Sequence, residues 1–178
     1  MTFLLLSGTG FCRIIETPED TISIKRKLHC KVLMQKKSFA LNHVHFISEK
    51  TGYAVGQQCL VLKTEDGGKT WNYLLTSKIN NWLYSAAFHG RDSILLVGES
   101  GTMLASGDGG KKWKSVVSHT SDTIFSLSFC AGKTGFASGG KGMILLSKDQ
   151  GNSWRKIKSN TDQNLYSVFC LHENLAYA

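Results

Sequence analysis

The sequence predicts an all-β chain, arranged as a partial β-propeller of about four blades. An octapeptide rich in Asp and Gly and ending in Trp recurs three times, at intervals of about 41 residues. A second glycine landmark stands ten residues before each octapeptide aspartate. Eighteen glycines accompany a single proline, a composition typical of short strands joined by tight turns. Four short apolar segments per repeat match the four antiparallel strands of a propeller blade.

The octapeptide is the stronger of the two landmarks. TEDGGKTW at 64–71 recurs as SGDGGKKW at 106–113 and as SKDQGNSW at 147–154. Asp66 and Asp108 are 42 residues apart, and Asp108 and Asp149 are 41 apart. A fixed period of this length is the sequence signature of a repeat architecture.

The second landmark closes an apolar segment at Gly56, Gly98 and Gly139. Earlier segments have an apolar residue at both ends, as the period of two of a strand requires, namely VHF at 44–46, AAF at 86–88, LSF at 127–129 and VFC at 168–170. The first strands are predicted near 43–47, 83–88, 124–129 and 165–170. The second strands are predicted near 52–56, 93–98 and 135–139, and the third near 59–64, 102–106 and 142–147. Each fourth strand begins at an octapeptide tryptophan.

The whole of 1–178 is predicted to form a single partial propeller. Its blades are a degenerate one at 1–40, full ones at 41–81, 82–122 and 123–164, and the start of another at 165–178. FLLLSGTG at 3–10 overlays ILLVGESG at 94–101, so the chain opens at a second strand. That apolar run is therefore expected to be a strand rather than a signal peptide or a membrane span.

The octapeptide residues are interpreted as structural. The aspartates are expected to accept hydrogen bonds from turn amides, the glycines to adopt positive φ and the tryptophans to be buried between strand layers. One carboxylate site per blade keeps the aspartates far apart, and each turn offers too few oxygens for calcium. The residues concerned are Thr64, Asp66, Gly68, Thr70, Trp71, Ser106, Asp108, Gly110, Trp113, Ser147, Asp149, Gly151, Ser153 and Trp154.

The pattern Ser/Thr-x-Asp-x-Gly-x-Thr-Trp resembles the Asp-box (BNR repeat) of sialidases, xyloglucanases and sortilin-type receptors. Together with the glycine turn VGESG at 97–101, it is most similar to the photosystem II stability/assembly factor-like family. This resemblance implies a seven-bladed propeller that assists photosystem II assembly, without a cofactor. It also implies export, to the thylakoid lumen, the periplasm or the extracellular space. The chain departs from the pattern at Lys112 and Gln150, and no box occurs in 1–40.

No catalytic or metal site is predicted. FCRII at 11–15 lacks the proline of the sialidase Arg motif, and no glycosidase motif surrounds Glu99 or Asp122. His43 and His45 share one strand face, as half of a metal site would, but no third ligand is evident, so channel-lining or solvent-facing histidines are expected instead. The five cysteines are odd in number and lack CxxC spacing, so packed thiols are expected, with neither a zinc site nor a disulfide framework.

The leading hypothesis is a non-catalytic scaffold that binds a protein, such as a subunit of a membrane complex. The alternative is a sialidase- or xyloglucanase-like glycoside hydrolase, or a glycan-binding module. The net charge is +8, but no nucleic-acid motif accompanies the lysines, so no nucleic-acid partner is expected. In an antiparallel blade the turns after the second and fourth strands lie opposite the Asp-boxes. The candidate partner-binding residues at that end are Gln57, Gln58, Trp82, Glu99 and Lys141.

Overall fold

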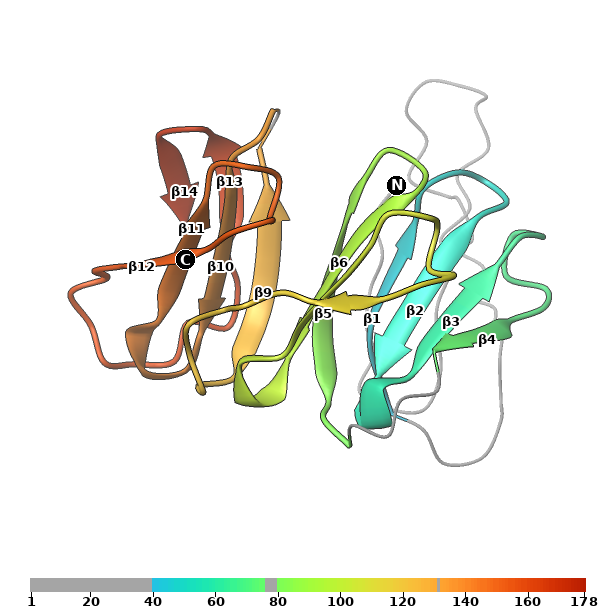
Figure 1. The fold of residues 1–178 in the computed structure, drawn as a ribbon, viewed down its shortest axis with the longest axis horizontal. Coiled ribbons are helices and arrows are strands. Elements are labelled where there is room, and N and C mark those ends of the chain that lie inside the picture. The colour runs from blue at the N-terminus through green and yellow to red at the C-terminus, as the bar shows by residue number, and fades with distance from the viewer. Residues whose placement is uncertain (1–39, 76–79, 131) are drawn as a thin grey trace, which may run out of the picture. The chain divides into compact units, whose positions relative to one another are not determined.

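The structure is a computed structural model that describes residues 40–75, 80–130 and 132–178 (Figure 1). The chain divides into a unit of residues 1–40 and a unit of residues 41–178, and the second is described below. Apart from residue 40, the predicted degenerate blade lies outside the described residues, and so do Cys12 and Cys30. Within those residues, no helix is long and apolar enough to cross a membrane.

Residues 41–178 form three four-stranded antiparallel sheets, in each of which neighbours in sequence are neighbours in space. The first sheet contains β1 (Leu41–Phe46), β2 (Gly52–Gly56), β3 (Val61–Thr64) and β4 (Asn72–Leu75). The second contains β5 (Leu83–His89), β6 (Ser93–Gly98), β7 (Met103–Ser106) and β8 (Lys114–Ser115). The third contains β9 (Ile124–Phe129), β10 (Gly135–Gly139), β11 (Ile144–Ser147) and β12 (Arg155–Ile157). A two-stranded sheet follows, with β13 (Phe169–His172) and β14 (Leu175–Tyr177). The predicted all-β class and four-stranded blades are confirmed.

Three short 3₁₀ turns connect the second and third strands, and they shift the predicted starts of the third strands. They are η1 (Gln57–Cys59), η2 (Glu99–Gly101) and η3 (Gly140–Gly142). The middle residue of each turn has positive φ, 56° at Gln58, 53° at Ser100 and 54° at Lys141. Because the turn contains these residues, β3, β7 and β11 begin one or two residues later than predicted.

The landmark glycine ends the second strand because another chain segment crosses it. A Cβ atom on Gly98 would lie 2.1 Å from the carbonyl oxygen of Trp82, and one on Gly139 would lie equally close to that of Thr123. Any side chain would therefore displace the connector that leads into the first strand. The glycine is a requirement of close packing at this end of the blade.

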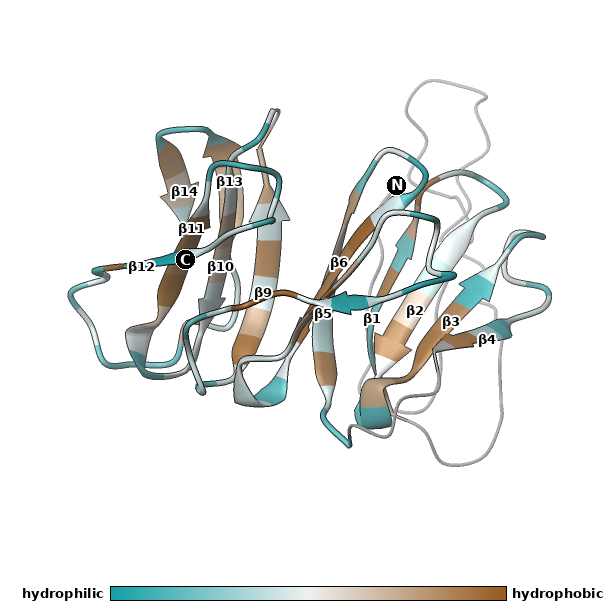
Figure 2. Cartoon of the chain, in the orientation of Figure 1, coloured by the Kyte–Doolittle hydropathy of each residue, from teal (hydrophilic) through white to brown (hydrophobic). Residues whose placement is uncertain are grey.

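The core lies between neighbouring sheets rather than within one sheet. Every residue of β2 and β10 is buried, and so are five of the six residues of β6. Figure 2 shows hydrophobic residues concentrated on middle strands such as β3, β6 and β11. Tyr53 and Val55 of β2 share one buried cluster with Leu83 and Leu96 of the second sheet. A second cluster joins Val97 of β6 to residues of the third sheet in the same way. Face-to-face stacking of this kind is the packing of propeller blades.

The expectation of packed thiols is wrong for Cys130 and Cys170, which form a disulfide with Cα atoms 5.2 Å apart. The two residues are 40 positions apart, about one repeat, and they come from consecutive blades. The stacking of blades brings the first strands of consecutive repeats side by side, an effect that spacing rules for local cysteine motifs do not detect. Cys59 remains a buried free thiol, and burial raises its pKa.

Candidate functional site

The Asp-boxes form one end of the blades. The carboxylate Oδ1 of Asp66 accepts a hydrogen bond from the amide of Thr70 at 2.9 Å. Asp108 accepts the same hydrogen bond from the amide of Lys112, and Asp149 accepts it from the amide of Ser153, both at 2.9 Å. In each box the first hydroxyl donates a hydrogen bond to the aspartate. The same hydroxyl accepts a hydrogen bond from the amide of the shared glycine at 2.8 Å. These hydroxyls belong to Thr64, Ser106 and Ser147, and the glycines Gly68, Gly110 and Gly151 have φ of 86°, 90° and 82°.

Each box also docks on the hairpin between the first and second strands of its own blade. The amide of Gly67 donates to the carbonyl of Lys50 at 2.8 Å, and that of Gly109 donates to Asp92 at 2.9 Å. The third box repeats the contact through Gln150 and Lys133, again at 2.9 Å. The two kinds of turn therefore lie at one end of the blade, and the η turns lie at the other.

The box aspartates are strongly acidic and are engaged within their own turns. The hydroxyl and amide of Thr70 lower the pKa of Asp66 to about 2. The Lys112 amide lowers the pKa of Asp108, and the Ser153 hydroxyl lowers that of Asp149. Such carboxylates are poor proton donors at neutral pH. In the described part of the chain, no group of three or more His, Cys, Asp or Glu side chains is placed to hold a metal ion.

The three box tryptophans are not buried equally. Trp154 is only 3% exposed, and its indole Nε1 donates to the carbonyl of Gly151 at 3.1 Å. Trp71 and Trp113 are half-buried. The three tryptophans therefore share one motif position but differ in burial, and Trp154 is the most deeply buried.

At the opposite end, the structure places the five candidate partner-binding residues in or beside the η turns. Trp82 and Glu99 lie together, since the Trp82 amide donates to Glu99 Oε2 at 2.9 Å and the Glu99 amide donates to the Trp82 carbonyl at 2.9 Å. Lys141 forms an ion pair with Asp122 at 2.9 Å. Gln57 and Gln58 belong to η1 of the first blade, and Gln58 is exposed. The Trp82 side chain is 37% exposed.

Trp82 is one end of a row of aromatic rings that sequence reasoning missed. Its ring centroid lies 6.4 Å from that of Tyr84, which lies 5.5 Å from Phe125, which lies 4.9 Å from Tyr166. We call these four side chains the aromatic row. Tyr84, Phe125 and Tyr166 occupy one position in three consecutive repeats, 41 residues apart, so aligning the repeats could have found them. Tyr166 at the far end is 69% exposed.

Glu99 and Asp122, the nearest suggestion of a glycosidase pair, are both engaged with neighbours. Glu99 accepts hydrogen bonds from the Trp82 amide and, at 3.5 Å, from the Tyr84 hydroxyl. The Lys141 ammonium lowers the pKa of Asp122. A glycosidase acid needs a raised pKa, so Asp122 does not fit that role.

His43 and His45 lie on β1 with ring centroids 6.4 Å apart, and His45 stacks on Phe88 at 4.8 Å. Burial and the neighbouring His45 lower the pKa of His43 to about 4, so its imidazole is neutral at pH 7. The pair contributes to an aromatic contact between the first and second blades.

Solved structures that resemble this chain include two of YCF48 and one of an ancestral GH74 enzyme, and these three have sequence identities low enough that they show the fold alone. YCF48 bound to D1 peptide has a TM-score of 0.63 at 22% identity, over 73% of this chain and 43% of that one. YCF48 from Cyanidioschyzon merolae has a TM-score of 0.59 at 23% identity, over 72% and 43%. An ancestral GH74 enzyme has a TM-score of 0.57 at 20% identity, over 72% of this chain and 20% of the enzyme. The chain thus spans less than half the length of the YCF48 structures.

The sequence itself matches a family model. No curated protein sequence matches the chain significantly. The family model described as photosynthesis system II assembly factor YCF48 matches residues 25–121, more than half of the chain. This match covers two of the three Asp-boxes, as well as Trp82 and Glu99. The chain therefore belongs to the photosynthesis system II assembly factor YCF48 family of BNR β-propellers.

Proposed function

We propose that this protein is a non-catalytic scaffold that binds a protein partner during assembly of a membrane complex, as photosystem II assembly factors do. Family membership supports this function, and one of the similar structures is described as YCF48 bound to D1 peptide. The observation that carries the proposal is the aromatic row, which crosses three consecutive blades at the end opposite the Asp-boxes. Its exposed ends are Trp82 and Tyr166.

Rings arranged in this way suit protein recognition. Aromatic side chains bring a large contact area at low conformational cost and are enriched among the residues that dominate binding energy. The fold supports the row from behind, because Glu99 fixes the main chain of Trp82 through two hydrogen bonds. The opposite face is held by the boxes, so the loops at this end are free to serve binding.

The glycoside hydrolase alternative receives no support from the described carboxylates. The three box aspartates are engaged within their own turns, and Glu99 and Asp122 are engaged with Trp82 and Lys141. The similarity to the GH74 enzyme is a similarity of fold alone. A protein partner, such as a subunit of photosystem II, is therefore the proposed ligand class.

The test is calorimetric titration of the protein with a D1 peptide, comparing wild type with Trp82→Ala. We expect the substitution to weaken binding about tenfold, the size of effect seen for interface anchors, with an unchanged melting temperature. Tyr73→Ala is the matched control, because Tyr73 is a 58% exposed aromatic outside the row. A lowered melting temperature with preserved affinity would show that Trp82 only caps its own blade.

A further inference from the structure

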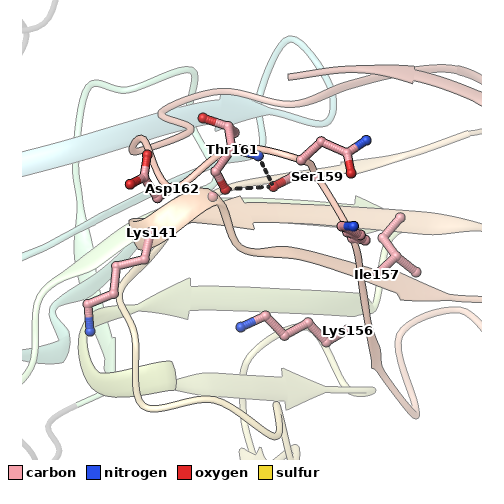
Figure 3. A pocket seen from close by; sticks show the side chains of 9 residues that line it. Lys141, Lys156, Ile157, Ser159, Thr161 and Asp162 are labelled. Carbon is pink, nitrogen blue, oxygen red and sulfur yellow. Dashed lines mark hydrogen bonds between the residues drawn. The ribbon is translucent and has the colours of Figure 1, made fainter.

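A shallow depression of about 650 Å³ lies beside η3, between that turn and the segment that follows β12 (Figure 3). Three of its lining residues are lysines, and most of the others carry a hydroxyl, amide or carboxyl group. The lining residues are Lys141, Gly142, Lys156, Ile157, Lys158, Ser159, Asn160, Thr161 and Asp162. We call this depression the lysine pocket.

The frame of the lysine pocket is fixed by the backbone. The Gly142 amide donates to the carbonyl of Gln163 at 2.7 Å. The connector crosses directly over the turn, since a Cβ atom on Gly142 would lie 1.9 Å from the Thr161 carbonyl oxygen. The Ser159 hydroxyl donates to the same carbonyl at 3.1 Å. These contacts hold the pocket wall without any help from the lysines.

The preceding blade has the same frame without the charges. A Cβ atom on Gly101 would lie 1.9 Å from the Thr120 carbonyl oxygen, and the Ser118 hydroxyl donates to that carbonyl at 3.2 Å. The register agrees as well, because Lys156 pairs with Leu145 just as Ser115 pairs with Leu104. By this alignment, Lys141, Lys156, Lys158 and Asp162 correspond to Ser100, Ser115, Val117 and Ser121. The fold therefore does not require lysine at these positions.

The charge of the pocket is only partly neutralised. Lys141 pairs with Asp122 at 2.9 Å, and its side chain is still 80% exposed. Lys156 and Lys158 are exposed and have no ion pair with any described residue. Asp162 is the single acidic residue of the lining, and it accepts a hydrogen bond from Gln163. Figure 3 shows the amines of Lys141 and Lys156 on the same side of the connector.

The lysine pocket also adjoins the aromatic row. The side-chain oxygen of Asn164 accepts the Lys141 amide at 3.1 Å, and its side-chain nitrogen donates to the Tyr166 hydroxyl at 3.2 Å. One side chain thus links the pocket turn to the end of the row. One bound segment could therefore contact both, because the pocket turn and the row share Asn164 as a neighbour.

We propose that the lysine pocket binds the carboxylates of an acidic peptide segment whose neighbouring apolar side chain packs on the aromatic row. The inference rests on the proposed function and adds the chemistry of the partner. Ammonium groups form charge-assisted hydrogen bonds with carboxylates, and the pocket adds hydroxyl and amide donors. Positive charge without a structural role is the observation that favours an acidic ligand over a neutral one.

The test uses the full chain and two synthetic peptides, one with a tryptophan followed by four glutamates and one with glutamines in their place. The key variant is Lys156→Ser with Lys158→Val, which installs the residues of the preceding blade. Lys114→Ser with Lys148→Ser is the control, since it removes two exposed lysines elsewhere. In wild type we expect the glutamate peptide to bind about tenfold more tightly than the glutamine peptide, a typical effect of charged contacts. The key variant abolishes that difference and the control retains it.

The reciprocal variant tests the frame argument. Ser115→Lys with Val117→Lys should strengthen binding of the glutamate peptide by creating a second charged pocket on the same scaffold. Equal affinity of wild type for both peptides would overturn the inference. So would an equal loss in the key and control variants, or equally tight binding of a single-stranded DNA of matched charge, since both indicate general attraction of polyanions. If Trp82→Ala leaves peptide binding unchanged while the key variant still abolishes the preference for glutamate, the proposed role of the row fails and the lysine pocket stands.

Discussion

Asp66, Asp108 and Asp149 hold their turns through the same pair of hydrogen bonds, and small sequence changes around them adjust the local electrostatics. Thr70 and Ser153 each add a hydroxyl that donates to the aspartate, whereas Lys112 contributes its amide. The repeated residue types made these turns predictable, since an aspartate and a glycine at fixed offsets answer a local geometric need. The unequal burial of the three tryptophans was not predictable from the motif, because all three occupy the same position in it.

Trp154→Ala should lower the free energy of unfolding by about 3–5 kcal/mol, the usual cost of truncating a buried aromatic. Trp154 loses its contact with Phe129, whose ring centroid lies 6.1 Å away, and its hydrogen bond to Gly151. Trp113→Ala should cost less, because that ring is half-buried. Urea denaturation followed by circular dichroism measures both. Equal costs would mean that the partial exposure of Trp113 does not reduce its contribution to stability.

At the scale of strands, the second strand of each blade was predicted to the residue. A hairpin at one end and the close-packed glycine at the other fix β2, β6 and β10. β13 was predicted to begin at 165, but it begins at Phe169. The amides of Val168 and Cys170 bond instead to the hydroxyls of Ser126 and Ser128 on β9. These partners belong to the preceding blade, so a reading of one repeat alone cannot anticipate them.

The aromatic row and the disulfide were missed for the same reason. Tyr84, Phe125 and Tyr166 are unremarkable within any one strand, and Cys130 and Cys170 have no local spacing motif. Both features appear once the first strands of consecutive blades are placed side by side. In a repeat protein the contacts between neighbouring repeats carry much of this information.

The disulfide gives a prediction at the scale of elements. Cys130→Ser should lower the free energy of unfolding by about 2–4 kcal/mol, because the cross-link closes a loop of one repeat in the unfolded chain. Cys170→Ser and the double variant should lose the same amount, since either change removes the one bond. Thermal denaturation with and without a reducing agent is the measurement. Additive losses, or an undiminished effect of reductant on the double variant, would mean that the bond does not supply this stability.

Across residues 41–178, each buried cluster belongs to two blades at once. Tyr53 and Val61 of the first blade meet Leu83 and Leu96 of the second, and Val97 and Met103 of the second meet Ile124 and Leu145 of the third. A four-stranded sheet with both faces apolar is not stable alone in water, so each blade depends on its neighbours. The stability of the described unit is therefore a property of the interfaces.

Leu96→Ala tests this dependence, because Leu96 is completely buried on β6 and faces the cluster shared with the first blade. We expect a loss of about 2–5 kcal/mol, the range for truncating a buried leucine. Native-state hydrogen exchange should show the loss of protection in the amides of β2 as well as in those of β6, with a smaller change in β10. The matched variant Leu145→Ala, in the cluster between the second and third blades, should shift the effect to β6 and β10 and leave β2 better protected. Unchanged protection of β2 in the Leu96→Ala variant would mean that the first sheet is stable without its neighbour.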